Sequence, residues 1–206
     1  MNNTLFKSTN NLLAFCLGVT RAVEAITIAK RLVPAILLAC IAFIPAGCNK
    51  HSDKCKGLDE DKAFAKSCAG LQQQTRCELQ QAKEATTKYR DIKVAEKDGY
   101  ADISVILPNM GYHFMKATLA DAAFEITRPE ILVYNKTHEG DFELVAVEYA
   151  VPIELTPDHA PEGFTGTADV WDHNTGFGLW LLHAWVFTPN EAGVFNPTNP
   201  GVHVHQ

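Results

Sequence analysis

The stretch FELVAVEYAVPI, residues 142–153, carries apolar side chains at both odd and even positions. Successive side chains of a strand point to opposite faces of its sheet. A strand that is apolar on both faces is expected to be covered on both sides, which places it at the centre of a sheet. Glu148 interrupts the pattern and shares a face with Phe142, Leu144 and Ala146. The stretch therefore predicts a central strand that buries a carboxyl group.

Further short apolar runs surround this stretch, separated by Pro, Gly, Asn and Asp. Such runs are typical of strands joined by turns, and Glu139-Gly140-Asp141 is a plausible hairpin turn. No helical period lies between the runs, which favours a mostly antiparallel sheet curled into a barrel or a sandwich. Besides 142–153, the predicted strands are 102–107, 111–117, 130–135, 166–171 and 178–188.

Two helices are predicted before the strands, at 59–69 and 76–98. Thr75 and Glu78 have the spacing of a capping box at the start of the second helix, and Gly99 ends it. The predicted fold class is α+β, with this N-terminal helical hairpin (58–100) packed on the β-rich segment 101–206 as one folded unit. The predicted core contains Leu79, Tyr89, Ile92, Val105, Phe114, Leu132, Leu144, Val147, Leu181 and Trp185.

The N-terminal 47 residues have the features of a secretory signal peptide. Basic residues precede an apolar run at 32–46, which is too short for a typical membrane span. Ala46-Gly47-Cys48 resembles a bacterial lipobox, so we expect cleavage before Cys48 and lipid attachment to its thiol. Residues 48–57 would form the lipidated tether, and the protein would be anchored to the periplasmic side of a bacterial membrane. The alternative is a plain signal peptide or an uncleaved anchor.

Three cysteines remain after the leader and Cys48 are set aside, namely Cys55, Cys68 and Cys77. An exported protein meets conditions in which disulfides persist. A helix over 59–69 separates Cys55 from Cys68 by about 15–20 Å, whereas a disulfide needs Cα atoms within about 7 Å. Cys68 and Cys77 flank the turn between the helices. The predicted disulfide is Cys68–Cys77, with Cys55 left free or used between molecules.

The charge of the 206-residue chain is concentrated in its β-rich part. Residues 101–206 contain 14 acidic side chains against only Lys116, Arg128 and Lys136, a net charge of −11. Such a surface repels phosphate backbones, which argues against nucleic-acid binding. It would favour cations, although simple solubility explains most of these charges.

Three polar residues are predicted to lie inside apolar strands: His113, Glu148 and His183. A buried charge without a partner costs several kcal/mol. Two imidazoles and one carboxylate that converge would form a site for a divalent transition metal, namely zinc, iron, manganese or copper. The alternative pairs Glu148 with Arg128 and leaves both histidines hydrogen-bonded in the core.

Two other histidine-containing segments are weaker candidates. His203 and His205 alternate in the C-terminal tail and could bind a metal, but terminal histidines are usually solvated. The segment 172–176 (DHNTG) is interpreted as a turn, and 190–206 as an ordered loop.

Several segments are similar to an uncharacterised bacterial family of small exported proteins, some of them lipoproteins. They include MGYH (110–113), RPEILVY (128–134), VEY (147–149), LHAW (182–185) and NPTNP (196–200). The similarity spans about residues 80–202. This resemblance implies an exported single domain and carries no activity.

Three functional classes fit these observations. The first is an exported metal-binding domain, whose status as an enzyme stays open. The second is a non-catalytic lipoprotein that binds an apolar or cationic small-molecule ligand in its barrel, and the third is a purely structural envelope protein with neither metal nor ligand. No phosphate-binding glycine loop, CxxC motif or serine–histidine–aspartate order competes with them.

Overall fold

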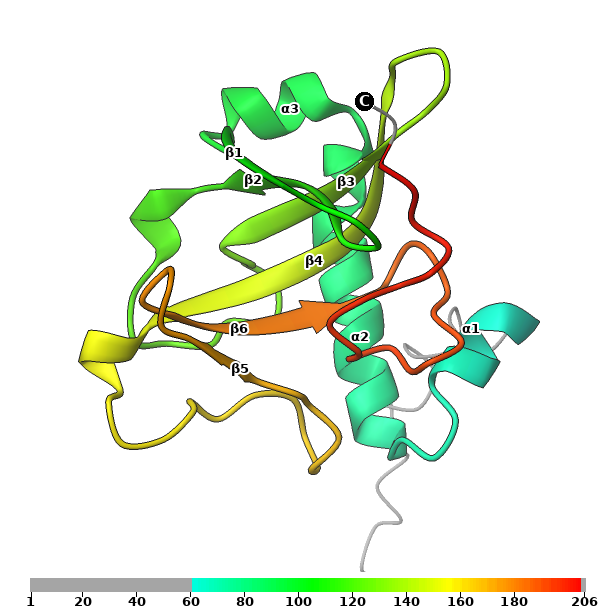
Figure 1. Ribbon diagram of the computed structural model, residues 1–206. Coiled ribbons are helices and arrows are strands. Elements are labelled where there is room, and N and C mark those ends of the chain that lie inside the picture. The colour runs from blue at the N-terminus through cyan, green and yellow to red at the C-terminus, as the bar shows by residue number, and fades with distance from the viewer. Residues whose placement is uncertain (1–60, 205–206) are drawn as a thin grey trace, which may run out of the picture. The chain divides into compact units, whose positions relative to one another are not determined.

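The computed structural model describes residues 61–204, which form an α+β fold as predicted (Figure 1). The N-terminal part of the described residues, 61–100, contains three helices and one 3₁₀ turn. They are α1 (Lys62–Ser67), α2 (Gln73–Thr86), η2 (Thr87–Arg90) and α3 (Ile92–Lys97). The strands are β1 (Ala101–Leu107), β2 (Gly111–Met115), β3 (Ile131–Lys136), β4 (Phe142–Pro152), β5 (Asp172–Asn174) and β6 (Leu179–Ala184), with short 3₁₀ turns η3 (Ala117–Leu119) and η4 (Ile153–Leu155).

The six strands form one antiparallel sheet in the order β1-β2-β3-β4-β6-β5. The sheet is curled into a half-barrel, so the prediction of an antiparallel, curled sheet is confirmed. β4 pairs with β3 on one side and with β6 on the other. Its central position follows from the apolar side chains on both of its faces. Eight consecutive residues, 144–151, are buried, and all of them except Glu148 are apolar or aromatic.

One face of the sheet packs against the helical segment. Phe114, Leu132 and Val147 lie opposite one another across β2, β3 and β4, and all three are buried. The Tyr134 hydroxyl on the same face donates to the Tyr89 carbonyl at 2.7 Å. Of the ten predicted core residues, Ile92 and Val105 are only half-buried and the other eight are buried.

The prediction of one continuous helix at 76–98 is wrong, because the structure has α2, η2 and α3 over this range. α2 ends at Thr86, where the hydroxyls of Thr86 and Thr87 bond back to carbonyls one turn earlier. Asp91 then begins α3, because its carboxylate accepts a hydrogen bond from the Lys93 amide at 3.0 Å. Side-chain bonds of this kind favour helix ends over helix interiors.

The predicted capping box is also wrong. α2 begins at Gln73, with Gln72 as an N-cap that makes no side-chain capping bond. Thr75 instead donates to the Thr165 carbonyl, and the buried Glu78 carboxylate accepts from the Thr165 amide at 2.7 Å and its hydroxyl at 2.6 Å. These side chains attach the long loop between β4 and β5 to α2.

The predicted strand at 166–171 is not formed, and β5 lies within the segment interpreted as a turn. Pairing with β6 begins only at Asp172, opposite Leu181. Trp171 instead packs edge-on against Phe124, at 6.1 Å between ring centroids. Aromatic packing therefore fixes the end of this loop, and the strand follows it. The tail up to Val204 contains no helix, as predicted.

The predicted Cys68–Cys77 disulfide is wrong. Cys77 is disulfide-bonded, whereas Cys68 is buried and takes no part in a disulfide. Cys68 ends α1 and packs into the same hydrophobic cluster as Phe64 and Leu79, which directs its side chain to the core. Cys48 and Cys55 lie outside the described residues, as do the predicted leader and tether. Within residues 61–204, no helix combines the length and hydropathy needed to cross a membrane.

Candidate metal centre

The register of the sheet brings His113, Glu148 and His183 to one face. Glu148 on β4 lies directly opposite His183 on β6. It also lies opposite Ile131 on β3, which pairs with Met115, two residues after His113 on β2. Because residues two apart share a face, all three polar side chains point away from the helix-packed side of the sheet.

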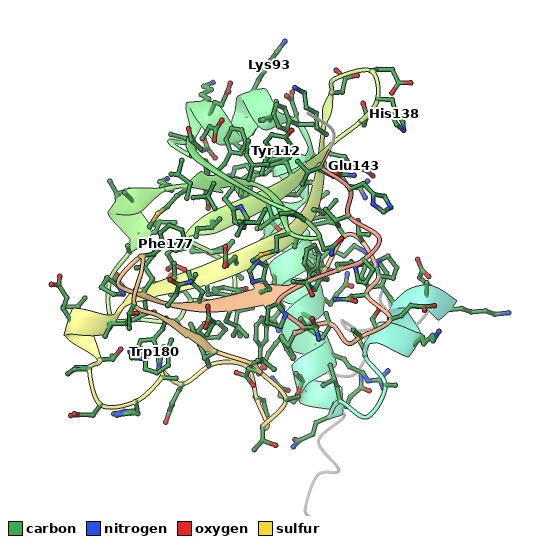
Figure 2. The ribbon with its side chains drawn as sticks, viewed as in Figure 1. Lys93, Tyr112, His138, Glu143, Phe177 and Trp180 are labelled. Carbon is green, nitrogen blue, oxygen red and sulfur yellow. The ribbon has the colours of Figure 1, made fainter. Side chains whose placement is uncertain are left out.

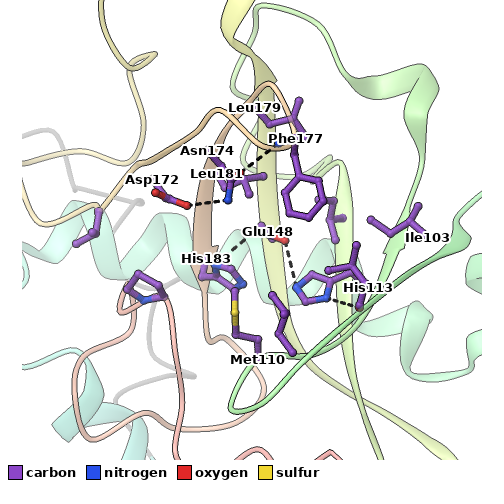
Figure 3. A pocket seen from close by; sticks show the side chains of 15 residues that line it. Ile103, Met110, His113, Glu148, Asp172, Asn174, Phe177, Leu179, Leu181 and His183 are labelled. Carbon is purple, nitrogen blue, oxygen red and sulfur yellow. Dashed lines mark hydrogen bonds and ion pairs between the residues drawn. The ribbon is translucent and has the colours of Figure 1, made fainter.

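The three side chains are buried and close together, as predicted. Their exposed fractions are 3% for His113, 1% for Glu148 and 4% for His183. Glu148 Oε2 lies 3.6 Å from His113 Nε2, and Glu148 Oε1 lies 3.3 Å from His183 Nδ1 (Figure 3). One ligand atom from each residue lies within 4.8 Å of the other two. This group could therefore hold a metal ion.

The alternative in which Arg128 pairs with Glu148 is wrong. Arg128 forms an exposed ion pair with Glu125, three residues earlier, at 2.8 Å. Among residues 61–204, the cluster of His113, Glu148 and His183 is the one group of three or more His, Cys, Asp or Glu with metal-binding spacing. His203 is not a member of it, and His205 lies outside the described residues.

The protonation of His113 is set by a backbone carbonyl. His113 Nδ1 lies 2.9 Å from the Val105 carbonyl of β1. A carbonyl only accepts hydrogen bonds, so Nδ1 carries the proton and the Nε2 lone pair faces Glu148. This is the arrangement in which a second partner orients a metal-binding histidine. Sequence reasoning expected such acceptors but did not identify Val105.

His183 has a buried nitrogen without a hydrogen-bond partner among the described residues, its Nε2. Its ring stacks on Trp185, with centroids 5.7 Å apart and planes 16° apart. The Trp185 indole in turn donates to the Asn196 carbonyl of the tail at 2.6 Å. A buried polar atom without a partner costs about 1–3 kcal/mol, so a donor, water or ion that reached this nitrogen would be stabilising.

Burial keeps the metal-free cluster uncharged. Loss of solvent, and to a smaller extent the negative charge of the nearby Asp172, raise the pKa of Glu148 to about 8. Loss of solvent also lowers the pKa of His183 to about 3 and lowers that of His113. At neutral pH the group therefore holds a carboxylic acid and two neutral imidazoles. A divalent cation would reverse the shift of Glu148, because an opposite charge favours the carboxylate.

The three residues form the polar floor of a cavity of about 70 Å³. Asp172 and Asn174 of β5 reach its side, and Figure 3 shows both above His183. Sequence reasoning missed them because it interpreted their segment as a turn. The rest of the lining is apolar and consists of Ile103, Val105, Leu107, Met110, Ile131, Val170, Phe177, Leu179, Leu181 and Pro197.

Comparisons of the chain with protein-family models, with curated proteins and with solved structures gave no significant match. The functional conclusion therefore depends on the geometry of the site.

Proposed function

We propose that this protein is an exported, lipid-anchored bacterial protein whose β-domain binds one divalent transition metal through His113, Glu148 and His183. The observation that carries the proposal is a buried group of three ligand side chains in which one ligand atom from each lies within 4.8 Å of the other two. A single ion among these atoms would be shared by all three side chains.

The donor set favours a particular class of metal. Two imidazoles suit zinc, iron, manganese or copper, whereas calcium and magnesium prefer a shell made of oxygen atoms. Three protein ligands leave at least one coordination position for water or a substrate, where the metal would act as a Lewis acid. The chain itself supplies the carboxylate, the oriented imidazoles and the enclosure.

Elemental analysis of the purified protein tests this proposal. The protein should be prepared without chelators and then reconstituted separately with zinc, iron(II), manganese or copper. We expect about one equivalent of metal per chain, removable by a chelator. Failure to retain any of the four ions would contradict metal binding and leave a structural or ligand-binding lipoprotein as the function.

The metal affinity should depend on pH through one proton. Burial raises the pKa of Glu148 to about 8, so a metal must displace its proton at pH 7. His183 has its pKa lowered to about 3 and does not compete. Zinc affinity should therefore rise about tenfold per pH unit below about pH 7, where Glu148 is almost fully protonated, and level off as the pH passes about 8. Calorimetry in buffers of different ionisation enthalpy should detect about one released proton, and zero would contradict this prediction.

The lipid anchor is tested by replacing Cys48 with serine. A serine hydroxyl cannot accept the thioether-linked diacylglyceryl group that the Ala46-Gly47-Cys48 motif predicts. The Cys48→Ser protein should move from the membrane fraction to the soluble fraction. Wild-type protein treated in parallel is the control, and an unchanged membrane fraction would contradict anchoring through Cys48.

A further inference from the structure

Most of the exposed large apolar side chains in the described part of the chain surround the metal centre. The six such side chains are Ile103, Ile106, Leu107, Leu155, Val170 and Phe177, with exposed fractions between 38% and 55%. Four of them, Ile103, Leu107, Val170 and Phe177, line the cavity above the cluster. We call these four residues the apolar rim. Scattered exposed apolar residues need no explanation, whereas a gathered set indicates a binding site.

The apolar rim is built from both ends of the sheet. Ile103 and Leu107 belong to β1, the first strand in the sheet order, and Val170 and Phe177 flank β5, the last. Phe177 lies in the turn that joins β5 to β6 (Figure 2) and is the most exposed of the set, at 55%. Curling of the sheet brings these edges to one cavity, with His113, Glu148 and His183 between them.

The cavity is large enough for only a small part of a ligand. A space of about 70 Å³ is below the roughly 300–1,000 Å³ of typical drug-sized pockets. It admits a small group of a few atoms to the floor. Anything larger must extend outward, between the exposed side chains of the rim, where an apolar chain or ring would lose contact with water.

The charge of the site limits the ligand further. Glu148 supplies one negative charge when a metal is bound, and the Asp172 carboxylate also lines the cavity. These two carboxylates balance a divalent ion. A ligand with several negative charges would therefore be repelled, and one neutral or singly charged donor group fits best.

We infer that the metal centre takes a small molecule with one metal-binding head group and an apolar tail that lies against the rim. This inference rests on the proposed function, since the metal holds the head group. It adds the class of ligand, which the three metal ligands alone do not define.

Titration of the zinc-loaded protein with two hydroxamic acids tests this inference. Acetohydroxamate and benzohydroxamate share the same metal-binding head, but only the second carries an aromatic ring. Calorimetric titration should show at least tenfold tighter binding of benzohydroxamate. In Phe177→Ser this preference should fall to about twofold, while acetohydroxamate affinity and zinc content stay as in wild type. Leu155→Ser removes a side chain of similar exposure, 50% against 55%, that does not line the cavity, and this variant should keep the full preference.

Each other outcome has a distinct meaning. Equal affinities in the wild-type protein, or equal losses in Phe177→Ser and Leu155→Ser, would overturn the inference while leaving metal binding intact. A dimer in light scattering that Phe177→Ser dissociates, without any change in benzohydroxamate affinity, would overturn it in favour of an interface between two copies. Absence of bound zinc would overturn both this inference and the proposed function.

Discussion

Glu148→Gln should remove metal binding while leaving the metal-free protein folded. Glutamine has nearly the shape of the protonated, uncharged carboxyl group that burial favours at this position. We therefore expect the free energy of unfolding of the metal-free protein to change by less than about 1 kcal/mol. Zinc affinity should fall at least about 100-fold, since even the outer partners of metal ligands contribute 10–100-fold. Competition with a chromogenic chelator measures the affinity, and thermal unfolding in a chelator measures the stability.

Glu143→Gln is the matched control for this variant. Glu143 lies on the same strand and is exposed, so its replacement should change neither quantity. A bound metal stabilises the folded state in proportion to the logarithm of its concentration over its dissociation constant. Zinc should therefore raise the melting temperature of wild type and Glu143→Gln, but not that of Glu148→Gln. A zinc-induced rise in Glu148→Gln equal to that of wild type would contradict the assignment of Glu148.

The site residues could be predicted because each of them is a polar residue inside an otherwise apolar stretch of sequence. Glu148 and His183 lie in runs that are apolar on both faces, and burying either side chain alone is costly. That cost predicts a shared partner before any pairing of strands is known. The central position of β4 follows from the same pattern, and the antiparallel pairing that unites the residues follows from the absence of intervening helices.

The hydrogen bond that orients the His113 ring could not be predicted, because it depends on an irregularity in the pairing of β1. The pairing of β1 with β2 shifts between Asp102 and Ile106, and Ser104 adopts a positive φ of 57°. This shift brings the Val105 carbonyl to His113 Nδ1. Bulges arise from the fit between two strands, and nothing in the sequence of one strand specifies them.

The capping-box error has a different cause, namely contacts over long distances in the chain. Thr75 and Glu78 have the spacing of a capping box, but they bind Thr165, about ninety residues later. The local spacing shows that these two side chains could form a capping box, but tertiary contacts determine which hydrogen bonds they actually form. The predicted Cys68–Cys77 disulfide is wrong for another reason, because Cys77 is disulfide-bonded but not to Cys68, which packs with Phe64 and Leu79.

Gly111→Ala should destabilise the fold strongly and weaken metal binding with it. Gly111 begins β2 with a φ of 110°, a backbone conformation that residues with a side chain rarely adopt. A Cβ there would also collide with the Tyr134 carbonyl of β3. Backbone cannot move aside as a flexible side chain can, so β2 would be pushed from β3. We expect a loss of at least about 3 kcal/mol in the free energy of unfolding, measured by denaturant titration.

Gly140→Ala separates the two contributions to this loss. Gly140 also has a positive φ, of 92°, but a Cβ there would meet nothing within 4 Å. Its replacement should therefore cost only about 1 kcal/mol, from backbone conformation alone. His113 follows Gly111 by two residues on β2, so displacing the strand should also move its imidazole from Glu148 and lower zinc affinity, which Gly140→Ala should preserve. Equal destabilisation by the two variants would show that β2 tolerates displacement from β3, and that the close approach at Gly111 does not position His113.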